Sequence, residues 1–302
     1  MNRIERRSGF VAVVGRPNAG KSTLLNTLFG RKILIISDKP QTTRNSIRCI
    51  LTEERGQVIF IDTPGIHKPK HQLGEYMVAA AKSSLRGVDM VVCVVDASVP
   101  FGTGDERVIE IIKDSKLPCI LALNKIDLIS KDNILEIIDK YSKLASFQEI
   151  IPISALQKEN TVKLMDLIFA ALPPGPMYYP EDSVTDQPEK FVIAELIREK
   201  LLHLTRQEIP HSVAVVVESM EEEKNLVKIG AVILVERDSQ KGIVIGRGGS
   251  VLKEVGSLAR QEIENLLGGK VFLEIFVKVK KDWRNQQNRL RELGYNLKEL
   301  QE

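Results

Sequence analysis

Cysteine is scarce in this chain, which holds only Cys49, Cys93 and Cys119 among its 302 residues. None belongs to a Cys-x-x-Cys pair, and no histidine stands near one at a metal-ligand spacing. This pattern argues against a disulfide framework and against a zinc site. It predicts a location in a reducing cytoplasm.

Long apolar runs are also missing. The longest runs, such as residues 90–95 and 167–172, have six residues, whereas a membrane-spanning helix needs roughly 18 or more. Residues 1–7 lack the long apolar core of a secretory leader. The sequence therefore predicts neither a membrane-spanning segment nor secretion.

Neither sign of charge is in large excess. The chain has 43 Lys and Arg against 40 Asp and Glu, a net charge of +3, which is too small to indicate a nucleic-acid partner by itself. Its 43% hydrophobic and 27% charged residues are typical of a globular protein. At about 150 residues per domain, the length fits two domains.

The first half of the chain has an alternating pattern. Short β-branched runs alternate with helix-length segments, and the runs are residues 10–14, 58–61, 90–95, 119–123 and 150–153. Apolar strands interleaved with helices predict an α/β fold, a mostly parallel sheet with helices on both faces. A proline-rich, polar stretch then follows at residues 173–188 and reads as a linker.

The rest of the chain has a different order of elements: helix, strand, strand, glycine loop, helix, strand. Apolar residues at helical spacing up to Leu204 predict the first helix, which Pro210 closes. The other expected elements are strands at 212–217 and 226–235 around a turn at 221–225, a helix after the glycine loop, and a last strand at 271–279. We therefore divide the chain into an α/β domain (1–174), a linker (175–188) and an α+β domain (189–302).

A Gly-x-x-x-x-Gly-Lys-Ser motif stands between the strand at 10–14 and a helix-like segment at 23–29. The N–H groups of such a loop cradle phosphates, while Lys21 reaches the outer phosphates and Ser22 ligates Mg²⁺. Taken alone, the motif could be an idle glycine turn. The predicted phosphate contacts are Gly15, Arg16, Pro17, Asn18, Ala19, Gly20, Lys21, Ser22 and Thr23.

Three further motifs follow predicted strands. Asp62-Thr63-Pro64-Gly65 places a carboxylate where Mg²⁺ and a γ-phosphate would lie. In Asn124-Lys125-Ile126-Asp127, the Asp127 carboxylate can accept hydrogen bonds from the N1–H and N2–H₂ edge of guanine, which adenine does not offer. Lys125 would cover the base plane, and Asn124 would either tie the loops together or touch the base. In Ser154-Ala155-Leu156, the Ala155 N–H would face the guanine carbonyl. Ligands bind at such strand ends in open α/β sheets.

These residues resemble the translation-factor-related GTPases, which are Ras-like in fold. The resemblance implies GTP hydrolysis with catalytic roles for Lys21, Thr43 and Gly65, and a first switch made of Gln41, Thr42, Thr43, Arg44 and Asn45. It also implies Ser22, Asp62 and Thr43 as Mg²⁺ ligands, with Thr42 as the alternative to Thr43.

One position departs from the Ras pattern. Ile66 stands where Ras-type enzymes carry the glutamine that orients the attacking water, so no general base is assigned. We interpret the next residue, His67, as a solvated switch residue. The family branch with this replacement often carries a phosphate-loop asparagine, here Asn18, that is associated with a bound potassium ion.

The glycine loop Gly246-Arg247-Gly248-Gly249 is similar to the Gly-x-x-Gly core of a type II KH domain, which clamps single-stranded RNA. Alone, this core commonly marks an ordinary turn. A basic run at residues 278–291 has six Lys and Arg against one Asp, and Trp283 within it either stacks on a base or packs against its own domain. The predicted RNA contacts are Ile245, Gly246, Arg247, Gly248, Gly249, Val251, Leu252, Lys253, Lys278, Lys280, Lys281, Trp283 and Arg284.

A single Ras-like domain followed by a type II KH domain resembles the Era family of bacterial GTPases over nearly the whole chain. The resemblance implies a switch that uses GTP, GDP and Mg²⁺, binds 16S ribosomal RNA near its 3′ end and assists maturation of the 30S subunit. It also implies a cytoplasmic monomer with a fraction on the cell membrane. A P-loop kinase would not need residues 124–127, and a pure RNA-binding protein would tolerate the loss of Lys21 or Asp62.

Overall fold

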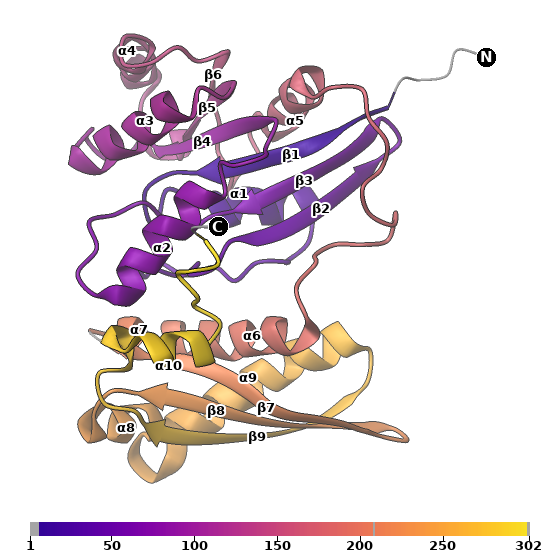
Figure 1. The fold of residues 1–302 in the computed structure, drawn as a ribbon, viewed down its shortest axis with the longest axis vertical. Helices are drawn as coiled ribbons and strands as arrows, with labels where there is room; N and C mark the ends of the chain where they lie inside the picture. Colours follow the sequence, from indigo (N-terminus) through magenta and orange to yellow (C-terminus); the bar gives the residue numbers. More distant parts are fainter. Residues whose placement is uncertain (1–5, 208, 301–302) are drawn as a thin grey trace.

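The computed structural model describes residues 6–207 and 209–300. Residues 1–5, on which the prediction about a leader partly depends, lie outside this description. The chain forms two bodies (Figure 1). The upper body is a six-stranded sheet together with its helices, and the lower body is a three-stranded sheet together with its helices. Within the described ranges, no helix combines the length and the apolarity needed to cross a membrane.

The upper body is the predicted α/β fold. Its strands lie in the order β2-β3-β1-β4-β5-β6, and all neighbours are parallel except β2 and β3. The strands are β1 (Arg7–Val14), β2 (Ile47–Glu53), β3 (Gly56–Asp62), β4 (Met90–Asp96), β5 (Cys119–Asn124) and β6 (Glu149–Pro152). The antiparallel edge strand β2 was not predicted, because Arg48, Thr52 and Glu53 interrupt its apolar residues.

Helices cover both faces of this sheet. They are α1 (Lys21–Phe29), α2 (Gln72–Ser83), α3 (Thr103–Ser115), α4 (Lys131–Ser142) and α5 (Thr161–Ala171), with a short turn η1 (Ile126–Leu128) after β5. Along β1, Val11 and Val13 face the core under α1 and α5, while Ala12 and Val14 face the core that α3 completes. Burial on both faces explains why the strands are continuously apolar.

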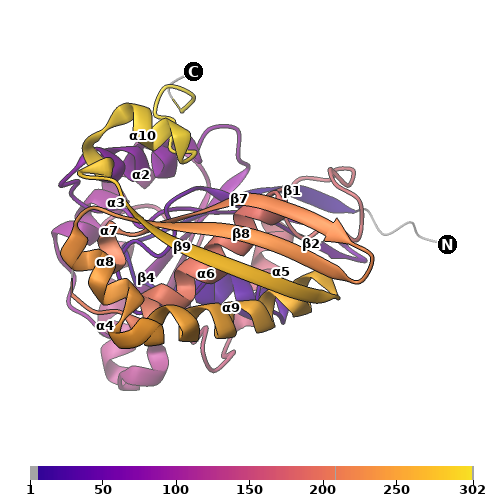
Figure 2. The same ribbon diagram turned by 90° about the horizontal axis from the view of Figure 1, so that it is seen from below.

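The lower body contains α6 (Glu189–Leu204), α7 (Ile209–Ser212), β7 (Ala214–Glu223), β8 (Leu226–Val235), α8 (Asp238–Ile245), η2 (Arg247–Gly249), α9 (Ser250–Leu267), β9 (Lys270–Val279), η3 (Trp283–Asn285) and α10 (Gln287–Glu292). Strand β8 pairs antiparallel with β7 and parallel with β9. Helices α6 and α9 share one core with the sheet. Figure 2 shows the three strands from below, with α10 at one end of the sheet.

Three expectations for the lower body were wrong in detail. The first helix ends at Leu204, and Pro210 lies within α7 instead of closing it. Strand β7 continues to Glu223, so the turn is only residues 224–225. Helix α8 was missed, because only Gln240 and Val244 of its eight residues are buried, and the glycine loop therefore joins two helices.

The proline-rich segment at residues 173–188 lies along the upper sheet. Ile50 N donates to Val184 O at 2.8 Å, and the Thr185 hydroxyl donates to Arg48 O at 2.8 Å. The buried Gln57 side chain accepts hydrogen bonds from the N–H groups of Tyr178 and Tyr179 at 2.8 and 2.9 Å. Most of the segment is therefore fixed to the upper body by hydrogen bonds. Its proline-rich, polar composition had indicated only a linker.

Candidate nucleotide site and RNA groove

The phosphate loop connects β1 to α1. Two of its glycines are required because neighbouring atoms lie too close to leave room for a side chain. A Cβ on Gly15 would lie 2.3 Å from Val94 O, and one on Gly20, whose φ is 95°, would lie 2.2 Å from Asn124 Nδ2. Lys21 is buried and folds back across the loop, donating to Arg16 O at 3.0 Å and to Gly15 O at 3.3 Å. The loop places the N-terminus of α1 where phosphates can bind.

Three side-chain oxygens converge beside this loop. The hydroxyls of Ser22 and Thr43 each donate to Asp62 Oδ2 at 3.0 Å, and they lie 3.2 Å from each other. Thr42 points elsewhere and donates to Lys39 O at 2.7 Å. Of the two adjacent threonines, the structure brings Thr43 to the predicted metal ligands.

The chemistry of this set fits a magnesium ion. Mg²⁺ prefers hard oxygen ligands, and all three groups are hydroxyl or carboxylate oxygens. Asp62 is fully buried, and within the described residues its Oδ1 atom finds no partner with hydrogen-bond geometry. Burial raises the pKa of Asp62, opposed by the charge of Lys21, and burial lowers the pKa of Lys21. A bound cation would favour the charged carboxylate.

At the base end, Asn124 ties the loops together. Its Nδ2 donates to Ala19 O at 2.9 Å, and its Oδ1 accepts from Ala155 N at 2.9 Å. Of the two roles considered for Asn124, the structure shows the tying role. The Ala155 N–H thus donates to Asn124 here, and its contact with a guanine carbonyl stays a prediction.

The remaining predicted base-site residues lie in the turn after β5 and in the segment after β6. Asp127 is exposed within η1, and Ile126 N reaches Ile153 O at 3.3 Å, which joins this turn to the end of β6. Leu156 is 72% exposed beside them. Lys125 pairs with Asp96. Sequence reasoning missed Asp96, although it ends β4 as Asp62 ends β3 and Asn124 ends β5.

The loop after β3 packs directly on the phosphate loop. A Cβ on Gly65 would lie 2.5 Å from Pro17 N, and Ile66 N donates to Gly15 O at 3.1 Å. The Ile66 side chain is 2% exposed and belongs to the core, so it cannot orient a water molecule. His67 is half-buried, with Nδ1 at 2.9 Å from Gly65 O and Nε2 at 3.3 Å from Gln41 Nε2. His67 therefore links the predicted first switch to the loop after β3. It is partly exposed, so it is only in part the solvated switch residue that the sequence predicted.

The second predicted site is the glycine loop between α8 and α9. Gly246, Gly248 and Gly249 have φ values of 77°, 62° and 79°, which favour glycine. A Cβ on Gly246 would also lie 2.6 Å from a methyl group of Val251. Ile245, Val251 and Leu252 are partly buried against the lower core, so they form an aliphatic wall beside the loop.

An open groove of about 590 Å³ continues from this loop between α9 and β9. Gly249, Leu252 and Lys253 were predicted to contact RNA, but the other residues of the groove were not. The residues that line it are Gly249, Leu252, Lys253, Gly256, Ser257, Arg260, Val271, Phe272, Leu273 and Ile275. The small residues Gly256 and Ser257, about two turns beyond the loop, were the available sequence signal for close approach of an RNA backbone.

Comparison with known proteins agrees with both sites. A family model described as 50S ribosome-binding GTPase matches residues 10–125, and a KH domain model matches residues 208–284. GTPase Era of Heliobacterium modesticaldum is 56% identical over 293 residues, which cover 97% of this chain and 98% of that protein. This chain belongs to the Era family of GTPases. The resemblance to the Era family that its motifs indicated is thereby confirmed.

Two solved Era structures share the fold. A variant of Era from Aquifex aeolicus, bound to GDP and aluminium fluoride, superimposes with a TM-score of 0.93 at 42% identity and covers 96% of this chain and 99% of that one. Era in complex with MgGDPNP and nucleotides 1506–1542 of 16S ribosomal RNA gives a TM-score of 0.94 with the same identity and coverage. The similarity therefore spans both bodies.

The basic run divides into surface and structural residues. Lys278 and Lys281 are exposed, and Lys278 pairs with Glu218 at 3.1 Å. Trp283 is 0% exposed, and its Nε1 donates to Ser212 O at 2.9 Å. Arg284 pairs with Glu236 and donates to His211 O at 3.3 Å. Base stacking by Trp283 is therefore wrong, and the packing alternative holds, because the ring has no exposed face.

Proposed function

We propose that this chain is a GTP-operated switch that binds the 3′ region of 16S ribosomal RNA and assists maturation of the 30S subunit. The observation that carries the proposal is the presence, in one chain, of a nucleotide site and a KH groove. Era solved with both a GTP analogue and a 16S ribosomal RNA fragment shares this arrangement over 96% of the chain. GTP binding at the upper site would then control RNA binding at the lower one.

In this proposal, Ser22, Thr43 and Asp62 hold Mg²⁺. The ion would neutralise the charge that develops on the phosphates during hydrolysis of GTP to GDP and phosphate. Lys21 and the backbone N–H groups of residues 15–23 hold the phosphates, and Gly65 approaches from the loop after β3. Asp127 accepts the guanine edge, and Leu156 covers one side of the base.

We also propose a potassium site at Asn18. The Asn18 amide is fixed, because its Nδ2 donates to Asp38 O at 2.7 Å, and this bond joins the phosphate loop to the segment before Thr42. The oxygen of the same amide is a suitable ligand for a monovalent cation. A cation here would supply positive charge to a site in which Ile66 cannot help to orient water.

The finer organisation rests on the family resemblance. We propose functional units at 1–174, 175–188 and 189–302, a monomeric state, and a cytoplasmic location with a peripheral membrane fraction. The hydrogen bonds that fix residues 173–185 to β1, β3 and β2 support pivoting of the lower body close to Glu189. Flotation with vesicles containing anionic lipid tests the membrane fraction, and recovery of all protein in the unbound fraction would refute it.

The main experiment is titration of a single-stranded fragment of the 16S ribosomal RNA 3′ end against protein loaded with GDP or with GDPNP. We expect tighter binding in one nucleotide state, and RNA must change nucleotide affinity by the same factor. The double variant Arg247→Glu/Gly248→Asp places carboxylates in the glycine loop at the end of the groove and should abolish binding. Equal affinities in both states would refute the coupling.

A matched control is available at the opposite end of the same sheet. The double variant Lys224→Glu/Asn225→Asp in the β7–β8 turn changes the net charge by the same amount outside the groove. It should bind RNA almost as well as the native protein. Equal loss in both double variants would indicate a nonspecific charge effect and would contradict the KH assignment.

A further inference from the structure

The segment that carries Thr43 is held by the lower body through helix α6. Glu199 Oε1 accepts a hydrogen bond from Ile36 N at 2.9 Å, and His203 Nε2 donates to Ile36 O at 2.8 Å. Arg198 of the same helix donates from Nη2 to the carbonyl of Thr42. One face of α6 therefore contacts the start of this segment and the residue immediately before Thr43.

The position of the Arg198 guanidinium is fixed by its own surroundings. Its side chain is 1% exposed, and Glu195, one turn earlier in α6, accepts from Nε at 2.7 Å and also pairs with Nη2. Burial lowers the pKa of Arg198, but the Glu195 carboxylate, together with Tyr295 and Glu199, raises it above its usual value. The group that donates to Thr42 is thus a charged guanidinium whose orientation is held by Glu195.

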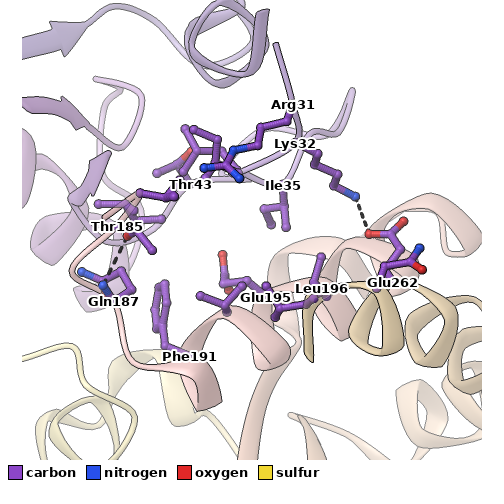
Figure 3. A pocket seen from close by; sticks show the side chains of 17 residues that line it. Arg31, Lys32, Ile35, Thr43, Thr185, Gln187, Phe191, Glu195, Leu196 and Glu262 are labelled. Carbon is purple, nitrogen blue, oxygen red and sulfur yellow. Dashed lines mark hydrogen bonds and ion pairs between the residues drawn. The ribbon is translucent and has the colours of Figure 1, made fainter. Parts of the chain in front are cut away.

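Next to this contact, α6 and the segment around Thr43 are separated by a cavity. Its volume is about 510 Å³, and Thr43 and Ile35 line one side while Phe191, Glu195 and Leu196 line the other (Figure 3). Ile35 packs in the same apolar cluster as α6. Thr43 itself faces α6 across the cavity, where the dispersion contacts that touching atoms would make are lost. The bond from Arg198 to Thr42 spans the distance beside the cavity.

The residue after Thr43 is held in a similar way. The side chain of Arg44 is buried, and it donates to Val213 O at 2.7 Å and to Pro210 O at 3.2 Å, both in the lower body. Burial lowers the pKa of Arg44. Thr43 thus lies between two residues that the lower body contacts through buried guanidinium groups.

We propose that Arg198 is a positioning residue for GTP hydrolysis. By holding the carbonyl of Thr42, it fixes the planar peptide unit that leads into Thr43 and keeps the Thr43 hydroxyl at Asp62. The same bond ties the position of the lower body to the metal site. This inference rests on the proposed function, because it assumes that Thr43 ligates Mg²⁺ when GTP is bound.

The two nucleotides should respond differently. In GTPases, contacts of the γ-phosphate and Mg²⁺ order the first switch, and hydrolysis releases it. Loss of Arg198 should therefore weaken the complex with a GTP analogue and leave the GDP complex unchanged. General destabilisation of the fold would weaken both complexes, which separates the two explanations.

The test compares full-length native protein with Arg198→Met and Arg198→Lys, and with Arg206→Met as a control at an exposed arginine just beyond α6. We expect Arg198→Met to bind GDPNP about tenfold more weakly, the effect of losing one hydrogen bond from a charged donor. GDP affinity should stay native, and single-turnover hydrolysis should need more Mg²⁺. Arg198→Lys should recover part of the loss, and Arg206→Met should match the native protein.

Two outcomes would overturn the proposal: native GDPNP affinity in Arg198→Met, or equal weakening of GDP and GDPNP. If Arg198→Met does not fold by circular dichroism, Glu195→Gln decides. Glu195→Gln keeps the Arg198 guanidinium that donates to Thr42 but removes the carboxylate that holds this guanidinium in place. A folded Glu195→Gln with an unchanged ratio of GDP to GDPNP affinity therefore also refutes the inference. Native protein that fails to bind guanine nucleotides would instead refute the proposed function.

Discussion

Trp283 offers a direct test of the structural role assigned to the C-terminal segment. It is the only tryptophan of the chain. Its ring is buried in a cluster with Leu73 and Met77 of α2, and it stacks near Tyr295 with ring centroids 6.4 Å apart. The cluster joins the helix that follows the Asp62 loop to the end of the chain. Replacing Trp283 by phenylalanine should therefore weaken the structure and spare RNA binding.

The expected magnitude follows from what the substitution removes. Loss of the Nε1 hydrogen bond to Ser212 O costs about 1 kcal/mol. The space left by the smaller ring costs about 1–2 kcal/mol more, a fraction of the 3–5 kcal/mol for complete truncation of a buried aromatic residue. The free energy of unfolding should fall by about 2–3 kcal/mol in total.

Urea denaturation followed by circular dichroism measures the loss of stability, and titration with the RNA fragment measures affinity under native conditions. Lys281→Ala is the matched comparison, because Lys281 is exposed in the same basic run. It should leave the denaturation midpoint unchanged, weaken RNA binding and reduce its salt dependence by about 0.7 for one lost phosphate contact. A native midpoint in Trp283→Phe together with weak RNA binding would restore the stacking role.

Three further predictions concern the upper body. Asp127→Asn should shift preference from GTP towards xanthosine triphosphate, because xanthine has a carbonyl where guanine has an amino group; unchanged GTP affinity with no gain for xanthosine would exclude the guanine assignment. Potassium should accelerate single-turnover hydrolysis relative to sodium, and Asn18→Ala should remove that difference; equal native rates in the two salts would end the potassium proposal. Burial and the charge of Arg284 lower the pKa of His71 to about 4, whereas an unfolded histidine titrates near 6.5. The unfolded state therefore takes up the proton first, and Tm should fall as the pH drops from about 6.5 towards 4. His71→Asn keeps an acceptor at the start of α2 and should lose less Tm over this range; an equal loss in both proteins would contradict the role of His71.

The sequence predicted which side chains converge beside the phosphate loop, because each of its motifs is local. Each motif is a few residues long and follows an apolar strand, and parallel strands bring their carboxyl ends to one edge of the sheet. Ser22 and Asp62 meet at 3.0 Å for this reason, although 40 residues separate them. The choice between Thr42 and Thr43 needed coordinates, because adjacent side chains leave the backbone in different directions.

The residues that line the groove of the lower body were harder to predict from the sequence. Spacing identified the glycine loop, but Arg260 and Phe272 line the groove only because α9 and β9 lie side by side. The sequence left open whether Trp283 stacks on a base or packs against its own domain, and it placed Arg284 among the RNA contacts. Tertiary packing buries Trp283 and pairs Arg284 with Glu236. Composition cannot distinguish a solvated charge from one that holds a buried carboxylate.

The sequence by itself determined which chemical groups this chain brings to phosphate, metal, guanine and RNA, because those groups sit at fixed short distances from strands and helices that hydrophobic pattern specifies. Only the tertiary structure decided how the two bodies communicate. Arg198 and Thr42 are 156 residues apart and meet through docking of α6 on the upper body. No periodicity or motif encodes such a contact, since it depends on the shapes of two separately folded surfaces.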